Sequence, residues 1–397
     1  MKNKIRYGII FFIAFLIVII SINLNEPNKN DKVRGTIQIW ASENTYNYLM
    51  ECANNFMESN EKVSISVNKI DDYNSLKSSL ENDKSNDVKI FEASEYELSK
   101  LGLDKFNYYN PDETILSVYS NNFSSYRLKQ VKDNNKIIGV PLTSRPLGLY
   151  LREDLLEEYG YKSDDFNTWD DVIRIGNDIY NKSNKSVKIL NATNQDYYDL
   201  LDLLIMQNLD KEKDKVKEDV NSQLEALDNN NILNRSNNKE YLGKISSING
   251  LKETLDSDEK WRIVTPPSNG LGKNKFFSSK GTELYVLNTK NDNSKLIDKF
   301  IIFVLSNNKE TVNYISSGDF FSSYLYTYKD KDIENPIDNF NGQNPLIVLS
   351  NIEEKAYTIN DYNKYLEIKE DFGFWYYPKS SFTFREDHKF SHKHLVY

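Results

Sequence analysis

Lys136-Ile-Ile-Gly-Val-Pro141, Leu147-Gly-Leu-Tyr-Leu-Arg152 and Thr168-Trp-Asp-Asp171 follow one another near the middle of the 397-residue chain. The first two are short apolar runs on either side of a proline-containing link, which predicts two strands. The third begins a helix, because Thr168 is suited to cap the first turn and Asp171, three residues on, completes a capping box. This stretch therefore has α/β character.

The same alternation precedes it. Apolar periodicity predicts strands at 35–40, 63–67 and 87–91, with helices at 46–57, 73–80 and 94–101 between and after them. Strands separated by helices need crossover connections, so this part of the chain is expected to form a largely parallel sheet.

Further elements are expected towards the C-terminus. Helices are predicted at 154–159, 196–206, 215–227 and 296–305, and a strand at 283–287. The polar, Asn-rich run 228–239 is expected to be a surface loop. We find no internal repeat in the sequence that follows the N-terminal apolar segment.

The N-terminus has the pattern of a membrane-targeting segment. Lys2, Lys4 and Arg6 precede the apolar run 7–22, which is close to the lower limit of about 17 residues for a membrane span. No small-residue cleavage site or cysteine follows. We therefore expect residues 1–24 to be a retained anchor, with a cleaved signal peptide as the alternative, and 25–34 to be a tether.

Composition limits the classes of function. The net charge of −9 argues against nucleic acid as a partner. The single cysteine, Cys52, allows no internal disulfide. No serine-hydrolase, zinc-protease or phosphate-loop motif is present. An enzyme would have to use paired carboxylates, for which Glu43 and Glu95 are the candidates.

Five segments carry a resemblance to a known family. Two of the five are quoted above: Lys136 to Pro141 running into the Gly-Leu-Tyr run, and Thr168 to Asp171. The other three are Ile37-Gln-Ile-Trp40 with the helix after it, Asp87-Val-Lys-Ile-Phe91, and Trp261-Arg-Ile-Val-Thr-Pro-Pro267 followed by 284–305. In their order along the chain, these segments resemble the family 1 extracellular solute-binding proteins of ABC sugar importers, the group that contains maltose-binding protein.

The resemblance implies a type II periplasmic-binding-protein fold with two α/β lobes joined by hinge crossings. By position, 35–143 with 284–317 would form the first lobe, and 144–283 with 318–397 the second. The crossings would lie near 143–145, 279–283 and 317–320. A ligand would be trapped when the lobes close.

The resemblance also implies a function. We expect a monomeric binding protein, not an enzyme, that needs no cofactor or metal and carries a carbohydrate to an ABC permease. It would lie on the extracytoplasmic face of the membrane, anchored by its N-terminal helix, or be secreted if that helix is cleaved. A ligand sensor or a surface-glycan-binding module of the same fold remains an alternative, and a glycosidase a more remote one.

The loop after the first strand contains four candidate ligand-binding residues: Trp40, Ser42, Glu43 and Asn44. Ligands of open α/β sheets bind beyond the carboxyl ends of strands. Glu43 and Asn44 would bond sugar hydroxyls there. The alternative is that Ser42 or Asn44 only caps the following helix.

The loop after the third strand offers Phe91, Ser94 and Glu95, since family members place aromatic and polar or acidic side chains here. The alternatives are a core position for Phe91 and a helix cap for Ser94.

Two cationic residues point to an acidic or modified sugar. Arg145 stands where many family members have a carboxylate, and its planar fork of donors suits an anionic group. Its alternative role is an ion pair with a carboxylate of the hinge. Lys252 stands near Asn249-Gly250, where sugar-binding relatives often have an aromatic residue, and we expect it to add positive charge to the cleft.

The C-terminal region supplies the last candidates. Trp375 and Tyr376, before Tyr377, are expected to stack on a sugar or, alternatively, to form a core. The three histidines, His388, His392 and His394, have no cysteine or acidic ligand set beside them, so a solvated tail is expected in preference to a metal site.

Overall fold

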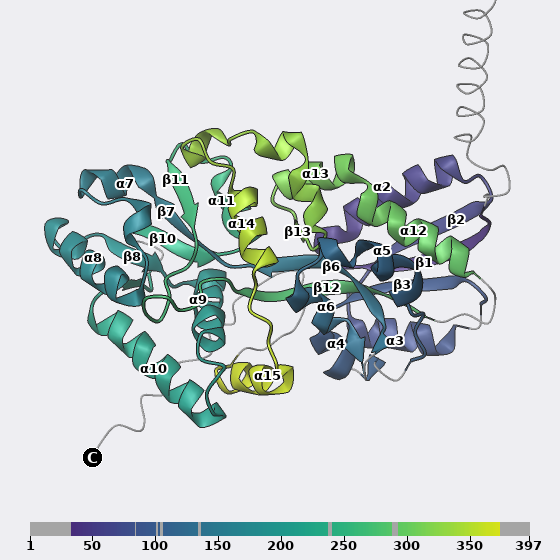
Figure 1. The fold of residues 1–397 in the computed structure, drawn as a ribbon, viewed down its shortest axis with the longest axis horizontal. Helices are drawn as coiled ribbons and strands as arrows, with labels where there is room; N and C mark the ends of the chain where they lie inside the picture. Colours follow the sequence, from purple (N-terminus) through teal and green to yellow (C-terminus); the bar gives the residue numbers. More distant parts are fainter. Residues whose placement is uncertain are drawn as a thin grey trace, which may run out of the picture.

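The computed structural model describes residues 33–373 except 84, 101, 104–105, 134–135, 237–239 and 288–292. Two sheets lie side by side along the long axis, joined through the central strands β6 and β12 (Figure 1). The structure therefore confirms the expected mixed α/β class.

The first sheet has six strands. Its order is β13 (Phe321–Ser322), β6 (Gly139–Pro146), β12 (Ser278–Val286), β3 (Val88–Ala93), β1 (Gly35–Ala41) and β2 (Val63–Lys69). β1 is parallel to β2 and β3, whereas β12 is antiparallel to β3 and β6. The parallel part is the crossover arrangement predicted from the strand–helix order.

Helices cover both faces of the first sheet, because its central strands have apolar side chains on both faces. On one face lie α2 (Glu43–Ser59), α12 (Ser294–Ser306) and α13 (Asn308–Ser316). On the other lie α3 (Tyr73–Asn82) and α4 (Glu95–Lys100). The short helices α5 (Ser117–Tyr119) and α6 (Ser125–Gln130) precede a two-stranded ladder of β4 (Lys132–Asp133) and β5 (Lys136–Ile137).

The second sheet has five strands, in the order β11 (Trp261–Val264), β7 (Gly148–Arg152), β10 (Tyr241–Ser246), β8 (Lys188–Asn191) and β9 (Leu233–Asn234). Its main core contains residues of α8 (Trp169–Lys182), α9 (Asn194–Met206), α10 (Lys213–Asn229) and α15 (Tyr362–Asp371). The remaining helices are α7 (Glu153–Glu158), α11 (Ile248–Thr254) and α14 (Pro345–Glu354). Leu346 and Leu349 of α14 belong to a different hydrophobic cluster, the one formed mainly by the core residues of the first sheet.

The predicted capping box is confirmed. The hydroxyl of Thr168 accepts a hydrogen bond from the amide of Asp171 at 3.2 Å, and the Asp171 carboxylate accepts one from the amide of Thr168 at 3.1 Å. Two donors at the start of α8 are thereby satisfied.

Two local predictions need correction. The run 137–141 is divided between β5 and β6, and β6 extends to Pro146. Pro141 fits within β6 because β13 pairs only with Thr143 and Ser144, which leaves Pro141 with a paired strand on one side. The loop predicted over 228–239 contains β9, because Leu233 and Asn234, 0% and 1% exposed, pair in parallel with β8.

Candidate functional site

In both sheets, the carboxyl ends of the parallel strands lie near the junction between the two sheets. In the first sheet Trp40 lies opposite Phe91, and Ala93 lies opposite Glu283 of β12. The loops after β1 and β3 therefore lie next to each other beside the joining strands. In the second sheet Ser246, the last residue of β10, pairs with Gly148, two residues after β6 ends. Ligands of α/β sheets bind at such edges.

A cavity lies at this junction, and we call it the junction cavity. Its lining residues come from the loop after β3, from β12 and from α15: Ser94, Tyr96, Ser279, Lys280, Tyr362, Leu366 and Lys369. Its empty volume is about 230 Å³, with room for about one water molecule. Tyr96 also packs against the core of the second sheet, so one residue of the first sheet's loop reaches across the junction.

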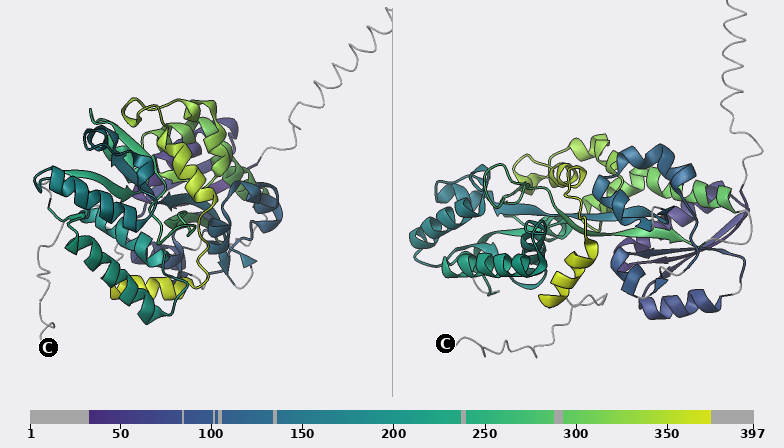
Figure 2. Two further views of the ribbon diagram at one scale, coloured as in Figure 1. Left: turned by 60° about the vertical axis from the view of Figure 1, so that its left-hand side comes forward. Right: turned by 60° about the horizontal axis from the view of Figure 1, so that its bottom comes forward.

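Helix α15 is held against the junction by buried polar contacts. The Tyr365 hydroxyl donates to Asp202 Oδ1 at 2.7 Å or to the carbonyl oxygen of Ser279 at 3.0 Å. Lys369 Nζ donates to Asp202 Oδ2 at 2.8 Å and lies 4.7 Å from the centre of the Tyr365 ring. In the right-hand view of Figure 2, α15 lies below the strands that join the sheets. These contacts position the three α15 residues that line the cavity.

The predicted residues after β1 have several different environments. The amide and hydroxyl of Ser42 both donate to the carboxylate of Glu92, each at 2.9 Å. Ser42 occupies the N-cap position of α2, but its side chain makes no cap hydrogen bond. Glu43 pairs with Lys69. Asn44 is exposed, and the half-buried Trp40 packs against the small core cluster beside α3.

The loop after β3 contributes Ser94 to the junction cavity. The Ser94 amide donates to Glu97 Oε2 at 2.7 Å, and its hydroxyl contacts the same oxygen. Phe91 is 0% exposed and stacks on Tyr285 with ring centres 5.5 Å apart. The structure therefore places Phe91 in the core, as the alternative interpretation expected. Glu95 is half-buried, and burial, together with the charge of Glu283, raises its pKa to about 8.

Arg145 has a carboxylate partner in this structure. Its Nη2 lies 2.6 Å from each oxygen of Asp199 in α9, and Asp199 is 1% exposed. Gln195 Nε2 also donates to Asp199 Oδ1, at 2.8 Å. Arg145 is thus in an ion pair, but its partner lies on α9 and not in a predicted hinge crossing, and the pair joins the end of β6 to α9.

Lys252 lies on α11, and its Nζ is 2.7 Å from Asp319 Oδ1. Its side chain is 59% exposed, and it does not line the junction cavity. Trp375 and Tyr376 lie outside the described residues.

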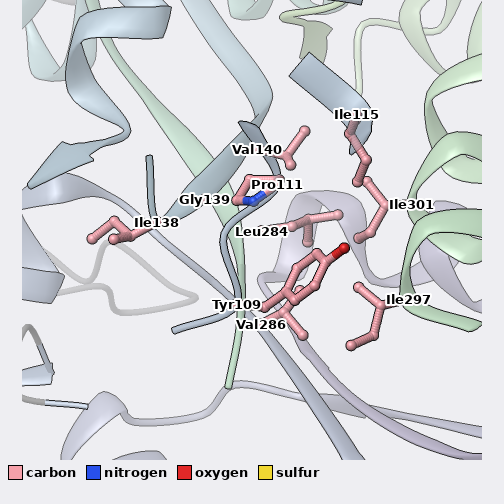
Figure 3. Close-up of a pocket in the computed structure, with 10 residues that line it drawn as sticks. All are labelled: Tyr109, Pro111, Ile115, Ile138, Gly139, Val140, Leu284, Val286, Ile297 and Ile301. Atoms are coloured by element: carbon pink, nitrogen blue, oxygen red, sulfur yellow. The ribbon is translucent and has the colours of Figure 1, made fainter. Parts of the chain in front are cut away.

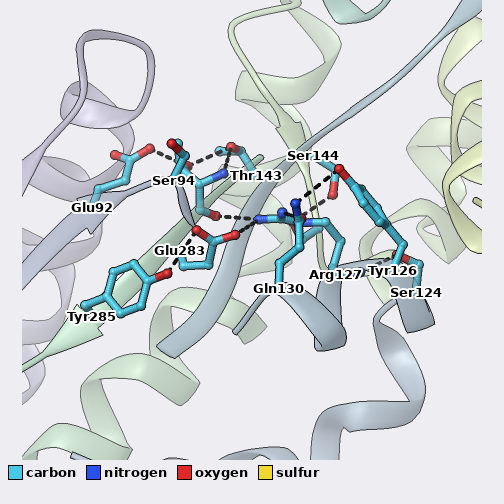
Figure 4. A network of polar contacts seen from close by, with 12 residues as sticks. Glu92, Ser94, Ser124, Tyr126, Arg127, Gln130, Thr143, Ser144, Glu283 and Tyr285 are labelled. Atoms are coloured by element: carbon cyan, nitrogen blue, oxygen red, sulfur yellow. Dashed lines mark hydrogen bonds and ion pairs between the residues drawn. The ribbon is translucent and has the colours of Figure 1, made fainter. Parts of the chain in front are cut away.

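A buried polar network connects side chains of β3, β12, β6 and α6 (Figure 4). Glu92 is 0% exposed and accepts hydrogen bonds from Ser42, from the Thr45 hydroxyl and from the Thr282 hydroxyl, the last at 2.6 Å. Thr282 in turn contacts the hydroxyl of Thr143 at 2.7 Å. The loop after β1 is thereby connected to both β6 and β12.

The next residue of β12 continues the network through an ion pair. Glu283 pairs with Arg127 of α6, both fully buried. Arg127 Nη2 also donates to the Thr282 carbonyl at 3.0 Å, and its Nε donates to the Ser323 hydroxyl at 3.4 Å. Burial raises the pKa of Glu283 to about 7 despite the opposing effect of Arg127. The guanidinium of Arg127 thus supplies the positive charge next to the Glu283 carboxylate.

A second cavity lies within the first sheet's core and has apolar character (Figure 3). It is lined by Tyr109, Pro111, Ile115, Ile138, Gly139, Val140, Leu284, Val286, Ile297 and Ile301 and leaves no room for a water molecule. The Tyr109 hydroxyl donates to Asp298 Oδ1 at 2.6 Å. This cavity is an imperfection in packing, not a ligand site.

Of the residues that line the junction cavity, sequence reasoning predicted Ser94 and missed the others: Tyr96, Ser279, Lys280, Tyr362, Leu366 and Lys369. Tyr96 adjoins the predicted Glu95, so its place in the chain was a usable signal. Tyr362 follows Asp361, which caps α15, and no sequence pattern places that helix beside the loop after β3.

Two absences hold for the described part of the chain. Within residues 33–373, leaving out the gaps stated above, no three His, Cys, Asp or Glu side chains are grouped as a metal ion would require. None of the described helices is both long and apolar enough to cross a membrane. The 7–22 run and the three histidines lie outside these residues.

Comparisons with known proteins extend this description. No family model matches the chain. A lactose-binding protein of Rhizobium radiobacter is 35% identical over 72 residues, which are 18% of this chain and 17% of that protein. The match thus spans less than a fifth of either protein.

Solved structures match over most of the chain. Maltose-bound MalE3 of T. maritima has a TM-score of 0.61 at 12% identity, covering 83% of this chain and 91% of that one. An ABC-transporter-associated binding protein of B. animalis subsp. lactis, in complex with β-1,6-galactobiose, has 0.58 at 15%, covering 85% and 90%. A family 1 extracellular solute-binding protein of Bifidobacterium longum subsp. infantis has 0.59 at 16%, covering 86% and 99%.

These neighbours are MalE-like, family 1 solute-binding proteins, and each is a binding protein, not an enzyme. The resemblance noted from the sequence is confirmed at the level of the fold.

Proposed function

We propose that this protein binds a carbohydrate at the junction cavity and delivers it to an ABC importer on the extracytoplasmic face of the membrane. The observation that carries the proposal is the cavity itself, which combines the loop after β3, the joining strand β12 and helix α15. It lies where the carboxyl ends of strands from both sheets converge. The sugars named for the structural neighbours above support a carbohydrate as the ligand.

The lining residues have the chemistry that a sugar requires. Tyr96 and Tyr362 offer rings whose apolar faces suit the C–H faces of a sugar and whose hydroxyls suit its polar edge. Ser94 and Lys280 add groups that bond hydroxyls.

The size of the cavity implies movement. The cavity has room for about one water molecule, whereas ligand pockets usually measure about 300–1,000 Å³. A disaccharide therefore enters only if the first sheet and α15 move apart. The joining strands β6 and β12 are where we expect such a hinge, with the sequence divided into lobes as predicted above.

The proposed ligand class is inferred from the residues that line the cavity and not from Arg145 or Lys252. Both have carboxylate partners, Asp199 and Asp319, so neither supports an anionic sugar over a neutral one. We propose neutral oligosaccharides as the first ligands to test, with acidic ones beside them.

Thermal shift provides the test. A saccharide at about 100 times its Kd stabilises the protein by about 2.7 kcal/mol. We expect a shift for the wild type that is lost in Tyr362→Ala and Tyr96→Ala. Tyr326→Ala is the matched control, because Tyr326 is 48% exposed and does not line the cavity. No shift with any saccharide, or equal shifts in all variants, would reject the proposal.

Delivery and anchoring need separate measurements. A permease reconstituted with the protein should bind the saccharide-loaded form more tightly than the unloaded form, because closure brings the two lobes into one arrangement. Anchoring by residues 1–24 predicts that the full chain fractionates with membranes and that a chain starting at residue 33 does not. Equal fractionation of both chains would contradict it.

A further inference from the structure

The hydroxyl group of Ser279 is buried without a hydrogen-bond partner. Ser279 is the second residue of β12 and is 1% exposed. Its carbonyl oxygen lies 3.0 Å from the Tyr365 hydroxyl, but its own Oγ has no hydrogen-bond partner among the described residues. Buried polar groups are almost always hydrogen-bonded. This hydroxyl group therefore indicates a partner outside the chain.

The position of Ser279 at a cavity distinguishes it from similar residues. It lines the junction cavity together with Ser94 of the loop after β3 and with Tyr362, Leu366 and Lys369 of α15. Several other described side chains have a buried polar atom without a partner, but none of them lines the junction cavity or the apolar cavity of the first sheet. Ser279 thus combines an unpaired hydroxyl group with access for a partner.

The irregular pairing of β12 explains how Ser279 reaches the cavity. The register between β12 and β6 shifts between Ser278 and Gly281. In a regular strand, Ser279 and Lys280 would point to opposite faces of the sheet, yet both line the junction cavity. A β-bulge changes the direction of side chains in this way. The bulge therefore brings two consecutive residues of β12 to the same cavity.

The other polar side chains of the lining are engaged. The Ser94 hydroxyl contacts Glu97. Lys369 Nζ donates to Asp202 Oδ2 at 2.8 Å and lies 3.1 Å from the Tyr365 hydroxyl. Lys280 and the two tyrosines of the lining have polar or ring contacts of their own. Ser279 is accordingly the lining residue with a buried hydroxyl group to spare.

The chemistry and the space both suit a neutral hydroxyl group as the partner. Ser279 offers one donor and two acceptor positions, and a sugar hydroxyl offers the same, so the bond can form in either direction. An anionic group could use only the donor. The cavity has room for about one water molecule, which is about the size of one hydroxyl group.

We propose that Ser279 Oγ forms a hydrogen bond with one hydroxyl group of the bound sugar and selects sugars that carry a hydroxyl at that position. This inference rests on the proposed function and names a specificity-determining residue of its site. Ser279 belongs to a joining strand and lies between the loop after β3 and α15. It therefore borders the space that opens when these two elements move apart.

Calorimetric titration of the full chain with maltose, β-1,6-galactobiose and the monodeoxy derivatives of whichever disaccharide binds provides the test. Ser279→Ala should bind the parent disaccharide about tenfold more weakly than the wild type, which is the effect of one hydrogen bond. For the wild type, removing one particular sugar hydroxyl should cost about the same factor. Ser279→Ala should bind that deoxy derivative and the parent equally well, because the partner of that hydroxyl is already missing.

Ser278→Ala is the matched control. Ser278 is the preceding residue of β12, 0% exposed, and its hydroxyl is also without a partner, but it does not line the cavity. Its variant should keep the affinity of the wild type and its preference among the deoxy derivatives. Without sugar, Ser279→Ala should have a thermal midpoint no lower than that of the wild type, because no hydrogen bond within the chain is lost.

The outcomes separate this inference from the proposed function. Wild-type affinity in Ser279→Ala overturns the role of Ser279 and leaves saccharide binding intact. The same holds if Ser278→Ala weakens binding equally, or if Ser279→Ala keeps the full preference among the deoxy derivatives. A lowered midpoint of sugar-free Ser279→Ala would assign its hydroxyl to the fold and not to the sugar. If neither these disaccharides nor any saccharide of the thermal-shift screen binds, the proposed function fails, and the role of Ser279 fails with it.

Discussion

Arg127 and Glu283 form an ion pair from which water is excluded, both side chains being 0% exposed. The pair joins α6 to β12, one of the strands that connect the two sheets. Removing one partner of such a pair leaves a buried charge without compensation, which is costlier than removing both.

We expect Arg127→Met to lower the free energy of unfolding by about 3–5 kcal/mol, because Glu283 loses its cation. Urea unfolding measures this. The double variant Arg127→Met with Glu283→Leu should recover much of the loss, and a double variant as unstable as the single one would contradict the explanation.

Gly281 is required for this arrangement. A Cβ at that position would overlap the carbonyl oxygen of Thr143 and the guanidinium of Arg127. Gly281→Ala should therefore destabilise the protein by at least the roughly 1–3 kcal/mol of an overpacked core. Gly272→Ala is the comparison, since no atom lies within 4 Å there and only its φ of +76° opposes alanine, at a cost of about 1–2 kcal/mol. A loss below about 1 kcal/mol for Gly281→Ala would contradict the prediction.

Stability should fall as the pH rises from about 5 to about 8. Burial raises the pKa values of Asp196, Glu283 and Glu95 to about 6, 7 and 8. In this range the folded state binds more protons than the unfolded state, so unfolding releases protons and becomes easier at higher pH. Thermal midpoints measured across the range test this. Glu95→Gln should reduce the decline, and a midpoint that rises with pH would contradict the prediction.

The Arg145–Asp199 pair should be energetically coupled. Arg145→Ala leaves Asp199, which is 1% exposed, without its cation. We expect a double-mutant cycle with Asp199→Ala to give a coupling free energy of about 1–3 kcal/mol. A coupling near zero would mean that the pair forms without stabilising the contact between β6 and α9.

Lys252→Ala should have almost no effect. Its contact with Asp319 is solvent-exposed, and such pairs contribute about 0–1 kcal/mol. We expect the free energy of unfolding to change by less than about 0.5 kcal/mol and saccharide binding to be unchanged. A loss of binding would return Lys252 to the list of ligand-binding residues.

The order of strands and helices was predictable from the sequence because each depends on spacing within a few residues. The periodicity of 46–57 and the capping pair Thr168 and Asp171 are local features, and both are found in the structure. β9 escaped prediction because Ile232 and Leu233, two apolar residues in an Asn-rich run, carry too little periodicity, and only pairing with β8 makes Leu233 and Asn234 a strand.

The candidate site was predictable only in part. The rule that ligands bind beyond the carboxyl ends of strands led to the loop that contains Ser94 and Glu95, which borders the cavity. It could not distinguish the buried Phe91 from the cavity residue Tyr96, because both are aromatic and only five positions apart.

The sequence by itself determined the α/β class, the succession of strands and helices over residues 35–101 and the loops in which a ligand site should be sought. Only the tertiary structure decided that Arg145 is paired with Asp199, 54 positions away, and that Tyr362 shares a cavity with Ser94. The physical reason is that periodicity and capping act within a turn or a strand. The burial of a side chain and the partner of a charge depend instead on which distant segments pack against it.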